Sequence, residues 1–259
     1  MWHRHAGLCS PGESNNPYAG TNADAIITRV IEDLRYELAL LRDLGFTHLD
    51  VRPSAAAVVS KSPVVVTCEP SASANDPASL LAEMAAVASV CVKCRLAETR
   101  TQVVYGVGSP SADLMFIGEA PGREEDLQGE PFVGRAGQLL TDIIKAMKLT
   151  RDDVYIANVV KCRPPENRNP EADELDACRP YIHRQIEVIQ PKIIVTLGKF
   201  ALQSLTGKTY AVSTTRGQWQ EFNGIRVMPT YHPAYLLRTP SAKKDVWADM
   251  KLVMAELGQ

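Results

Sequence analysis

The sequence predicts an α/β protein, with a three-layer αβα sandwich around a central, mostly parallel sheet of four strands and an N-terminal extension that is helical in part and otherwise disordered. Four short apolar runs read as strands: LMFIG (114–118), DVYIANVVK (153–161), KIIVTLG (192–198) and IRVMPTYHP (225–233). Helical patterns separate them, and strands that alternate with helices are typical of a parallel sheet covered on both faces.

The elements between the strands follow from local patterns. Helices are predicted at 136–148, 171–189 and 199–206. The last strand follows a predicted hairpin, in which QWQEF and IRVMP flank the dipeptide Asn223-Gly224. This dipeptide is a strong signal for a two-residue turn between antiparallel strands.

Residues 1–84 form the predicted extension, and residues 85–259 form the predicted domain. Residues 1–21 are polar and rich in Gly, Pro and Asn, which is typical of disorder. Apolar residues recur at three- and four-residue steps over 22–44, which predicts an amphipathic helix. Residues 51–80 are rich in Ala, Ser, Pro and Val and read as a linker. The apolar stripe is expected to bind a protein partner or a second copy. The alternatives are a docked or semi-ordered appendage and a tail without a role.

Bulk properties exclude few functions. The formal net charge of −2 does not exclude nucleic acid, because a local basic face matters more than the total. The sequence has no run of 18 apolar residues, so it predicts no membrane span, and the N-terminus lacks an apolar signal region. We therefore expect a cytoplasmic protein whose cysteines are metal ligands or thiols.

Polar residues or glycine end all four predicted strands, at Glu119, Asn158, Gly198 and His232. Ligands of open parallel sheets bind at the carboxyl ends of the strands. The pattern therefore predicts a site at this edge of the sheet, independently of any motif.

Four of the six cysteines are spaced as metal ligands. Cys91 and Cys94 form a C-x₂-C pair, and Cys162 and Cys178 lie 16 residues apart. Four thiolates can hold zinc or an iron–sulfur cluster, and the spacing does not separate the two. A redox pair is disfavoured because CVKC does not follow a strand, and unligated thiols are the remaining alternative.

With these pieces assembled, residues from about 85 to 255 resemble the family 4 uracil-DNA glycosylases, the iron–sulfur type. The resemblance rests on GEAPG (118–122), GEPFVGRAGQLL (129–140), NVVKCRPPENRNP (158–170), ACRPY (177–181) and YHPAYLLR (231–238), together with the four cysteines. It implies a [4Fe–4S] cluster held by Cys91, Cys94, Cys162 and Cys178. It also implies hydrolysis of uracil from single- and double-stranded DNA as a step of base-excision repair.

The resemblance implies a pocket for an extruded uracil. Uracil would stack on Phe132, and the carboxamide of Asn158 would match its N3–H and O4. Without the resemblance, Phe132 can be a core aromatic and Asn158 an ordinary turn residue. His232 would donate a hydrogen bond to uracil O2 as negative charge develops there, although a lone histidine at a strand end is more often structural.

The groups that position the attacking water and exclude thymine in family 1 enzymes are not present in this chain. Family 1 enzymes have Gln-Asp-Pro-Tyr where this chain has Glu119, Ala120, Pro121 and Gly122, so the aspartate that positions water is absent. The Ala120 carbonyl, with Glu119 nearby, is expected to hold the water. The tyrosine that blocks the 5-methyl group of thymine is also absent, and Glu125 is expected to fill the space over Gly122.

DNA contacts are predicted at two segments. In HPAYLLR, Leu236 or Leu237 would fill the vacated base stack and Arg238 would bind a phosphate, unless these leucines begin a core helix. Lys161 and Arg163 would face the DNA backbone near the cluster. Two other functions compete with the glycosylase: a non-catalytic metal-cluster module that binds nucleic acid, and a zinc-dependent nucleotide hydrolase. The first should have lost His232 or Asn158, and the second lacks a phosphate loop.

Overall fold

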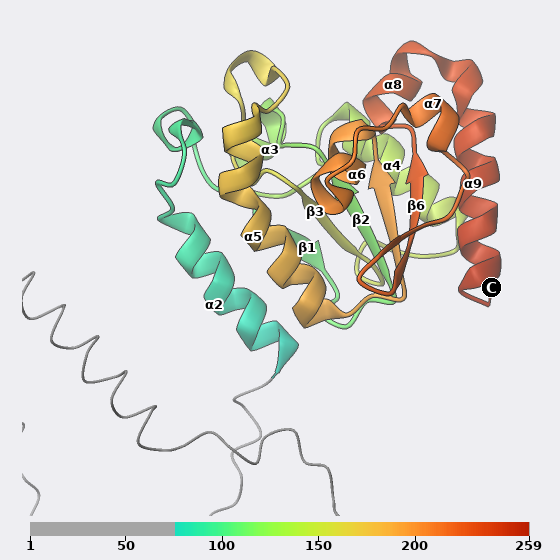
Figure 1. The fold of residues 1–259 in the computed structure, drawn as a ribbon, viewed down its shortest axis with the longest axis horizontal. Coiled ribbons are helices and arrows are strands. Elements are labelled where there is room, and N and C mark those ends of the chain that lie inside the picture. The colour runs from blue at the N-terminus through green and yellow to red at the C-terminus, as the bar shows by residue number, and fades with distance from the viewer. Residues whose placement is uncertain (1–75, 259) are drawn as a thin grey trace, which may run out of the picture. The chain divides into compact units, whose positions relative to one another are not determined.

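The computed structural model describes residues 76–258, and it confirms the α/β class with helices on both faces of one sheet (Figure 1). The described sheet has six strands rather than the predicted four, in the order β1-β3-β2-β4-β6-β5. They are β1 (Val107–Gly108), β2 (Leu114–Gly118), β3 (Tyr155–Asn158), β4 (Ile193–Leu197), β5 (Gln220–Phe222) and β6 (Ile225–Thr230). The four predicted strands are the parallel inner ones. The two additional strands are antiparallel edges.

The two edge strands were not among the four predicted strands, and the reason differs between them. β1 has only two residues, which is too short for any periodicity to be read. β5 is the first arm of the hairpin that Asn223 and Gly224 predict, and both turn residues have positive φ as that turn requires. The hairpin therefore extends the sheet by one strand.

Two layers of helices enclose the sheet. One face packs against α2 (Pro77–Ser89), α5 (Ala172–Ile189) and α6 (Lys199–Thr206). The other packs against α4 (Arg135–Ala146), α8 (Pro233–Arg238) and α9 (Lys243–Glu256). Short elements complete the description: α3 (Arg123–Gln128), α7 (Val212–Thr215), η1 (Arg95–Glu98), η2 (Pro165–Asn167) and η3 (Pro240–Ala242).

Strand residues divide between these layers by alternation. Ile117 and Ala157 join the core on the α5 side, whereas Phe116 and Ile156 join the core on the α4 side. Successive side chains of a strand point to opposite faces, so a strand covered on both faces must be apolar throughout. This is why the inner strands read as continuous apolar runs.

The strand register brings the predicted site residues to one edge. Gly118 at the end of β2 pairs with Asn158 at the end of β3. β3 ends at Asn158, three residues before the predicted end, and the next two amides donate to the carbonyls of Gly118 and Glu119 (both 3.0 Å). The chain beyond Asn158 therefore stays close to the GEAPG loop.

Helix α2 begins before the predicted domain boundary. The Asp76 side chain accepts a hydrogen bond from the Ser79 amide, and Pro77 occupies the first turn, where its missing N–H is tolerated. Residues 77–80, which the linker prediction included, are thus helical, and Leu81 is buried in the core. The predicted helix at 22–44 and residues 51–75 of the predicted linker lie outside the described residues.

Within residues 76–258, every helix is too short or too polar to cross a membrane.

Candidate active site

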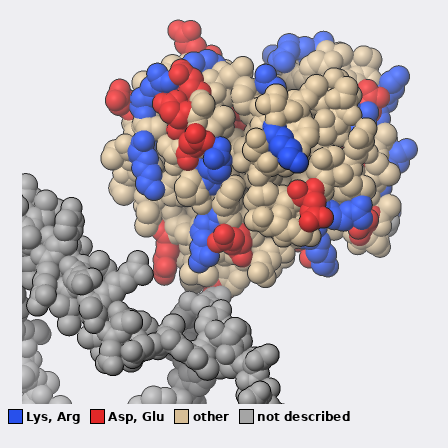
Figure 2. Space-filling view, viewed as in Figure 1, with Lys and Arg blue, Asp and Glu red and all other residues tan. Residues whose placement is uncertain are grey.

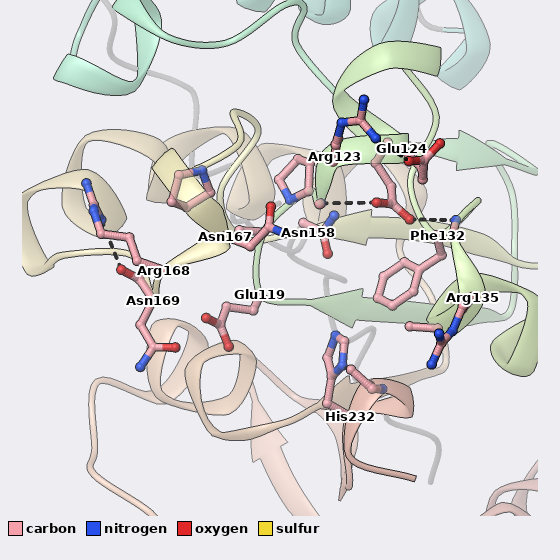
Figure 3. A pocket seen from close by; sticks show the side chains of 18 of the residues that line it. Glu119, Arg123, Glu124, Phe132, Arg135, Asn158, Asn167, Arg168, Asn169 and His232 are labelled. Carbon is pink, nitrogen blue, oxygen red and sulfur yellow. Dashed lines mark hydrogen bonds and ion pairs between the residues drawn. The ribbon is translucent and has the colours of Figure 1, made fainter. Parts of the chain in front are cut away.

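A cavity of about 600 Å³ lies at the carboxyl ends of β2, β3 and β6. It is lined by residues of the GEAPG loop, by the segment around Phe132, by Asn158 and by the start of α8. Figure 3 shows the rings of Phe132 and His232 and the carboxamide of Asn158 facing one space. The residues predicted for uracil binding and catalysis are thus brought together from four separate segments.

Phe132 lies in a loop with a strained backbone. Its φ of 56° is in the left-handed region, which is uncommon for an aromatic residue. Arg151 fixes this conformation by donating to the carbonyls of Phe132 (3.2 Å) and Pro131 (2.7 Å). Gly137 of α4 packs on the Phe132 carbonyl so closely that a side chain there would collide with it. The ring lies 5.7 Å from the His232 ring, with 33° between their planes.

Asn158 is buried at 1% exposure, and its carboxamide oxygen accepts no hydrogen bond from any residue in the described part of the chain. A buried acceptor left unpaired costs roughly 1–3 kcal/mol. Gly118 makes room for this group, since a side chain there would strike both the Asn158 oxygen and the Phe132 ring. The carboxamide therefore has an open acceptor that faces a ligand space.

His232 is held in one tautomer. It caps the N-terminus of α8, where its Nδ1 accepts a hydrogen bond from the Ala234 amide (3.1 Å). Burial lowers the pKa of His232 to about 4, and Arg238 adds to the effect. The ring is therefore neutral near pH 7, and because Nδ1 is the acceptor, Nε2 carries the proton. Among residues 76–258 this N–H donates to no other group, so it is available to a ligand in the cavity.

Glu119 and Ala120 line the same cavity. Burial raises the pKa of Glu119 to about 7, and the nearby Lys199 opposes this shift. The Glu119 carboxyl therefore exchanges its proton in the neutral pH range, unlike an exposed glutamate.

Glu125 joins the two loops of the site. One carboxylate oxygen accepts from the Gly122 amide (3.1 Å), and the other accepts from the amides of Val133 (3.0 Å) and Gly134 (2.9 Å). A β-carbon added to Gly122 would lie 2.8 Å from this carboxylate. The Glu125 side chain thus occupies the space over Gly122.

The structure differs from two of the predicted DNA contacts. Leu236 is 1% exposed and packs in the core, because α8 turns it inward while Leu237 stays exposed. Lys161 is also 1% exposed, and its Nζ donates to the Asn158 carbonyl (2.8 Å) and to the Gln185 side chain. Burial lowers the pKa of Lys161 to about 7. Neither side chain is free to enter or contact DNA.

The other predicted DNA contacts remain accessible. Arg238 is exposed and lines the cavity, and Arg163 is half-buried. Arg123 and Arg135 also line the cavity and are exposed, although no pattern in the sequence predicted a role for them. Figure 2 shows Lys and Arg mixed with Asp and Glu over the viewed face, with a group of basic side chains above α8.

The four cysteines of the predicted metal site lie near one another. Burial raises the pKa of the Cys178 thiol to about 11, and the charges of Cys162 and Cys94 add to this. Burial also raises the pKa of the Cys162 thiol, and the charges of Cys94 and Cys91 add to this. The Lys161 amide donates to the Cys178 sulfur (3.3 Å), and Arg100 donates to the Cys162 sulfur (3.4 Å). Across residues 76–258, however, no three His, Cys, Asp or Glu side chains are placed to hold a single metal ion.

A fold and a site of this kind match a known superfamily. The sequence profile described as "Uracil DNA glycosylase superfamily" matches residues 105–251. The type-4 uracil-DNA glycosylase of Sulfurisphaera tokodaii is 49% identical over 172 residues, which is 63% of this chain and 78% of the relative. Those of Archaeoglobus fulgidus and Saccharolobus solfataricus are 44% and 46% identical, covering 63% and 64% of this chain and 86% and 82% of the relatives.

The chain therefore belongs to the uracil DNA glycosylase superfamily, and within it to the type-4 group.

Proposed function

We propose that the protein extrudes uracil from DNA and hydrolyses the bond between uracil N1 and the sugar C1′, leaving an abasic site. The observation that carries this proposal is the buried oxygen of Asn158, which has no hydrogen-bond partner within residues 76–258 and faces the same cavity as Phe132 and His232 (Figure 3). Membership of the superfamily supports the reaction, and the geometry supports the roles of individual residues.

Base recognition rests on Phe132 and Asn158. The Phe132 ring provides a stacking surface, and the Asn158 oxygen accepts from uracil N3–H while its amide group donates to O4. Cytosine has an acceptor at N3 and a donor at C4, so it would leave the Asn158 oxygen unpaired. At roughly 1–3 kcal/mol for each buried unpaired group, this mismatch accounts for discrimination against cytosine.

Bond cleavage rests on His232 and Glu119. As the N1–C1′ bond breaks, uracil leaves with the electron pair, and the Nε2–H of neutral His232 stabilises the negative charge at O2 without transferring its proton. The sugar becomes cationic at C1′, where an ionised Glu119 stabilises it. Water adds to C1′ with the Ala120 carbonyl as its acceptor, and the proton that it loses passes to Glu119 or solvent.

Exclusion of thymine rests on Glu125. Its carboxylate covers Gly122, where family 1 enzymes have the tyrosine that blocks the 5-methyl group. We expect Glu125→Ala to admit thymine or 5-substituted uracils, and competition assays with G·T and G·U duplexes would measure this. Glu125→Gln keeps the volume and serves as the control. Unchanged selectivity of the alanine variant would remove this role.

DNA binding rests on cationic and apolar groups around the cavity. Arg238, Arg135 and Arg123 line the cavity and are exposed, and they would contact phosphates of the strand that carries the extruded base, as would Arg163 further along. Leu237, which is 37% exposed, is the leucine of the α8 segment that would enter the vacated stack. Single- and double-stranded substrates would both bind, since these groups address one strand.

Cys91, Cys94, Cys162 and Cys178 would hold a [4Fe–4S] cluster, as the resemblance implies. Burial, with the charges of neighbouring cysteines, raises the pKa of the Cys162 and Cys178 thiols, and no three of the four sulfurs lie at the spacing of a single metal ion. This arrangement suits a cluster better than zinc, whose 2.3 Å bonds draw thiolates to roughly 4 Å from each other. When bound, the cluster ties the segment after α2 to α5 and to the end of β3. N–H donors to the sulfurs of Cys162 and Cys178 suit thiolate ligands.

An oligonucleotide assay tests the function. Single strands and duplexes with one deoxyuridine opposite G or A are incubated with the protein and then cleaved with alkali. We expect cleavage at uracil that falls sharply in His232→Ala and Asn158→Ala. His183→Ala and Asn223→Gly, which lie outside the cavity, are the matched controls. An inactive wild-type protein with bound iron would favour the nucleic-acid-binding module instead.

A further inference from the structure

The cavity is larger than a single pyrimidine needs. Its volume of about 600 Å³ falls within the range of pockets that enclose a whole drug-sized ligand, roughly 300–1,000 Å³. Phe132 and His232 lie at one end, and Arg168 and Asn169 lie at the other, beyond Glu119 (Figure 3). Space for a second planar group therefore remains beside the extruded uracil, along the loop from Pro164 to Asn169.

This loop is held in place from the side away from the cavity. Both terminal nitrogens of Arg168 donate to Glu174 (2.9 and 2.6 Å), whose side chain is fully buried. Arg95, the residue after Cys94, donates to the same carboxylate (3.1 Å). The hydrogen bonds from Arg168 are the main reason why the pKa of Glu174 falls to about 2. The charge of Arg168 is thus engaged by Glu174 rather than free for a phosphate.

The loop also has a strained backbone at its tip. Glu166 and Asn167 both have left-handed φ values, of 54° and 55°. Such conformations are disfavoured for residues other than glycine and cluster where a ligand is gripped. Arg163 donates to the Asn167 side-chain oxygen (2.8 Å), and within the described part of the chain the amide group of Asn167 donates to no other residue.

The groups that the loop presents to the cavity are mostly neutral. Asn167 and Asn169 are exposed and line the cavity, together with the apolar ring of Pro164. Considering residues 76–258 only, neither side-chain amide nitrogen has a hydrogen-bond acceptor. Carboxamides match the edges of bases, and unstacked bases of a single strand are recognised by such hydrogen bonds together with packing on flat groups.

We propose that the loop from Pro164 to Asn169 is a second nucleobase site, which binds the base next to the extruded uracil through the carboxamides of Asn167 and Asn169. The proposal rests on the proposed function, because it requires uracil to lie against Phe132. It predicts that the neighbouring base contributes to turnover on one side of uracil, 5′ or 3′, but not on both.

Single-turnover kinetics on single-stranded oligonucleotides test the site. Each substrate has one deoxyuridine, and its 5′ or 3′ neighbour is either a normal nucleotide or a base-free tetrahydrofuran unit. For the wild-type chain, removal of the neighbouring base on one side should lower kcat/KM about tenfold, as loss of one base contact does. In the double variant Asn167→Gly and Asn169→Ala, this difference should vanish, with turnover of the base-free substrate unchanged. Glycine at 167 tolerates the left-handed backbone.

The control is Asn223→Gly, an exposed carboxamide with left-handed backbone in the β5–β6 turn, which should keep the tenfold difference. Equal losses by the double variant on both substrates would overturn the proposal, since the loop would then shape the uracil pocket or bind a phosphate. No neighbour effect in the wild-type chain would overturn it as well.

Binding separates this proposal from the function on which it rests. Dissociation constants of His232→Ala for the same oligonucleotides, measured before its slow residual cleavage proceeds, report the contribution of the neighbouring base to binding. If the dissociation constants with and without the neighbouring base are equal, the proposal of a second nucleobase site is overturned. A wild-type chain that releases no uracil from any substrate overturns the proposed function instead.

Discussion

Buried polar groups behave differently in the base pocket and in the layer behind it. In the pocket, and counting residues 76–258 alone, the Asn158 side-chain oxygen accepts no hydrogen bond and the His232 Nε2–H donates none. Behind it, the carboxylate of Glu174 accepts from two arginines and a backbone amide, and Lys161 donates to the Asn158 carbonyl and to Gln185. Unpaired groups are expensive to bury, so they are retained where a ligand completes them, whereas paired groups hold the surrounding chain in place. The comparison predicts that pocket variants lose activity and that variants of the supporting layer lose stability first.

The largest expected effect is on stability, at Glu174. Glu174→Ala leaves Arg95 and Arg168 without their buried partner, and breaking such a pair costs about 3 kcal/mol where the cations can reach solvent. Urea unfolding of the purified protein at pH 7 measures the loss. Glu187→Ala on the exposed side of α5 is the control, and equal stability of the two variants would contradict the role of Glu174.

An effect of similar size is expected on activity, at His232. Loss of one donor to a developing anion costs about 2.7–4 kcal/mol, so His232→Ala should lower kcat by about 10²–10³. Its free energy of unfolding should change little beyond the loss of the Ala234 cap contact. Single-turnover kinetics and urea unfolding on the same samples test both parts. Loss of folding in place of activity would identify His232 as structural.

An intermediate effect is expected at Lys161. Lys161→Met leaves the Asn158 carbonyl and the Gln185 side chain without their donor, which costs roughly 1–3 kcal/mol and should lower kcat/KM about tenfold through misplaced Asn158. The salt dependence of DNA binding should stay unchanged, unlike that of Arg238→Ala, because a buried lysine neutralises no phosphate. Lys208→Met is the exposed control. A weaker salt dependence of DNA binding for Lys161→Met would instead support the phosphate contact that the sequence predicted.

The smallest effect is expected at Glu119 and depends on pH. Because burial raises the pKa of Glu119 to about 7, its carboxylate forms as the pH rises through 7, and kcat should rise roughly five- to tenfold over pH 6–8. Glu119→Gln should remove this rise. Relative to that variant, the wild-type chain should become less stable as the pH rises from about 4.5 to about 7, because the unfolded chain ionises first. An unchanged pH profile of Glu119→Gln would assign the inflection to another group.

The sequence was a good guide where a pattern repeats along the chain. The four inner strands, helix α6 and the Asn223-Gly224 turn follow from apolar runs, periodicity and turn chemistry. The edge strand β1 was missed because two residues carry no pattern. Arg151 was missed because it lies 19 residues from Phe132 in the sequence, and nothing in its own segment marks it as the residue that holds the Phe132 carbonyl.

What the sequence determined by itself is the order of the elements, the chemistry at the strand ends and the family to which they point. What only the tertiary structure decided is the direction of individual side chains. Leu236 and Leu237 are identical in type and adjacent, yet the turn of α8 buries the first and exposes the second. Lys161 reads as a surface cation, yet the early end of β3 turns it beneath Asn158 towards α5. Residue type sets what a side chain can do, but its partners come from segments far away in the sequence, and only packing brings those segments together.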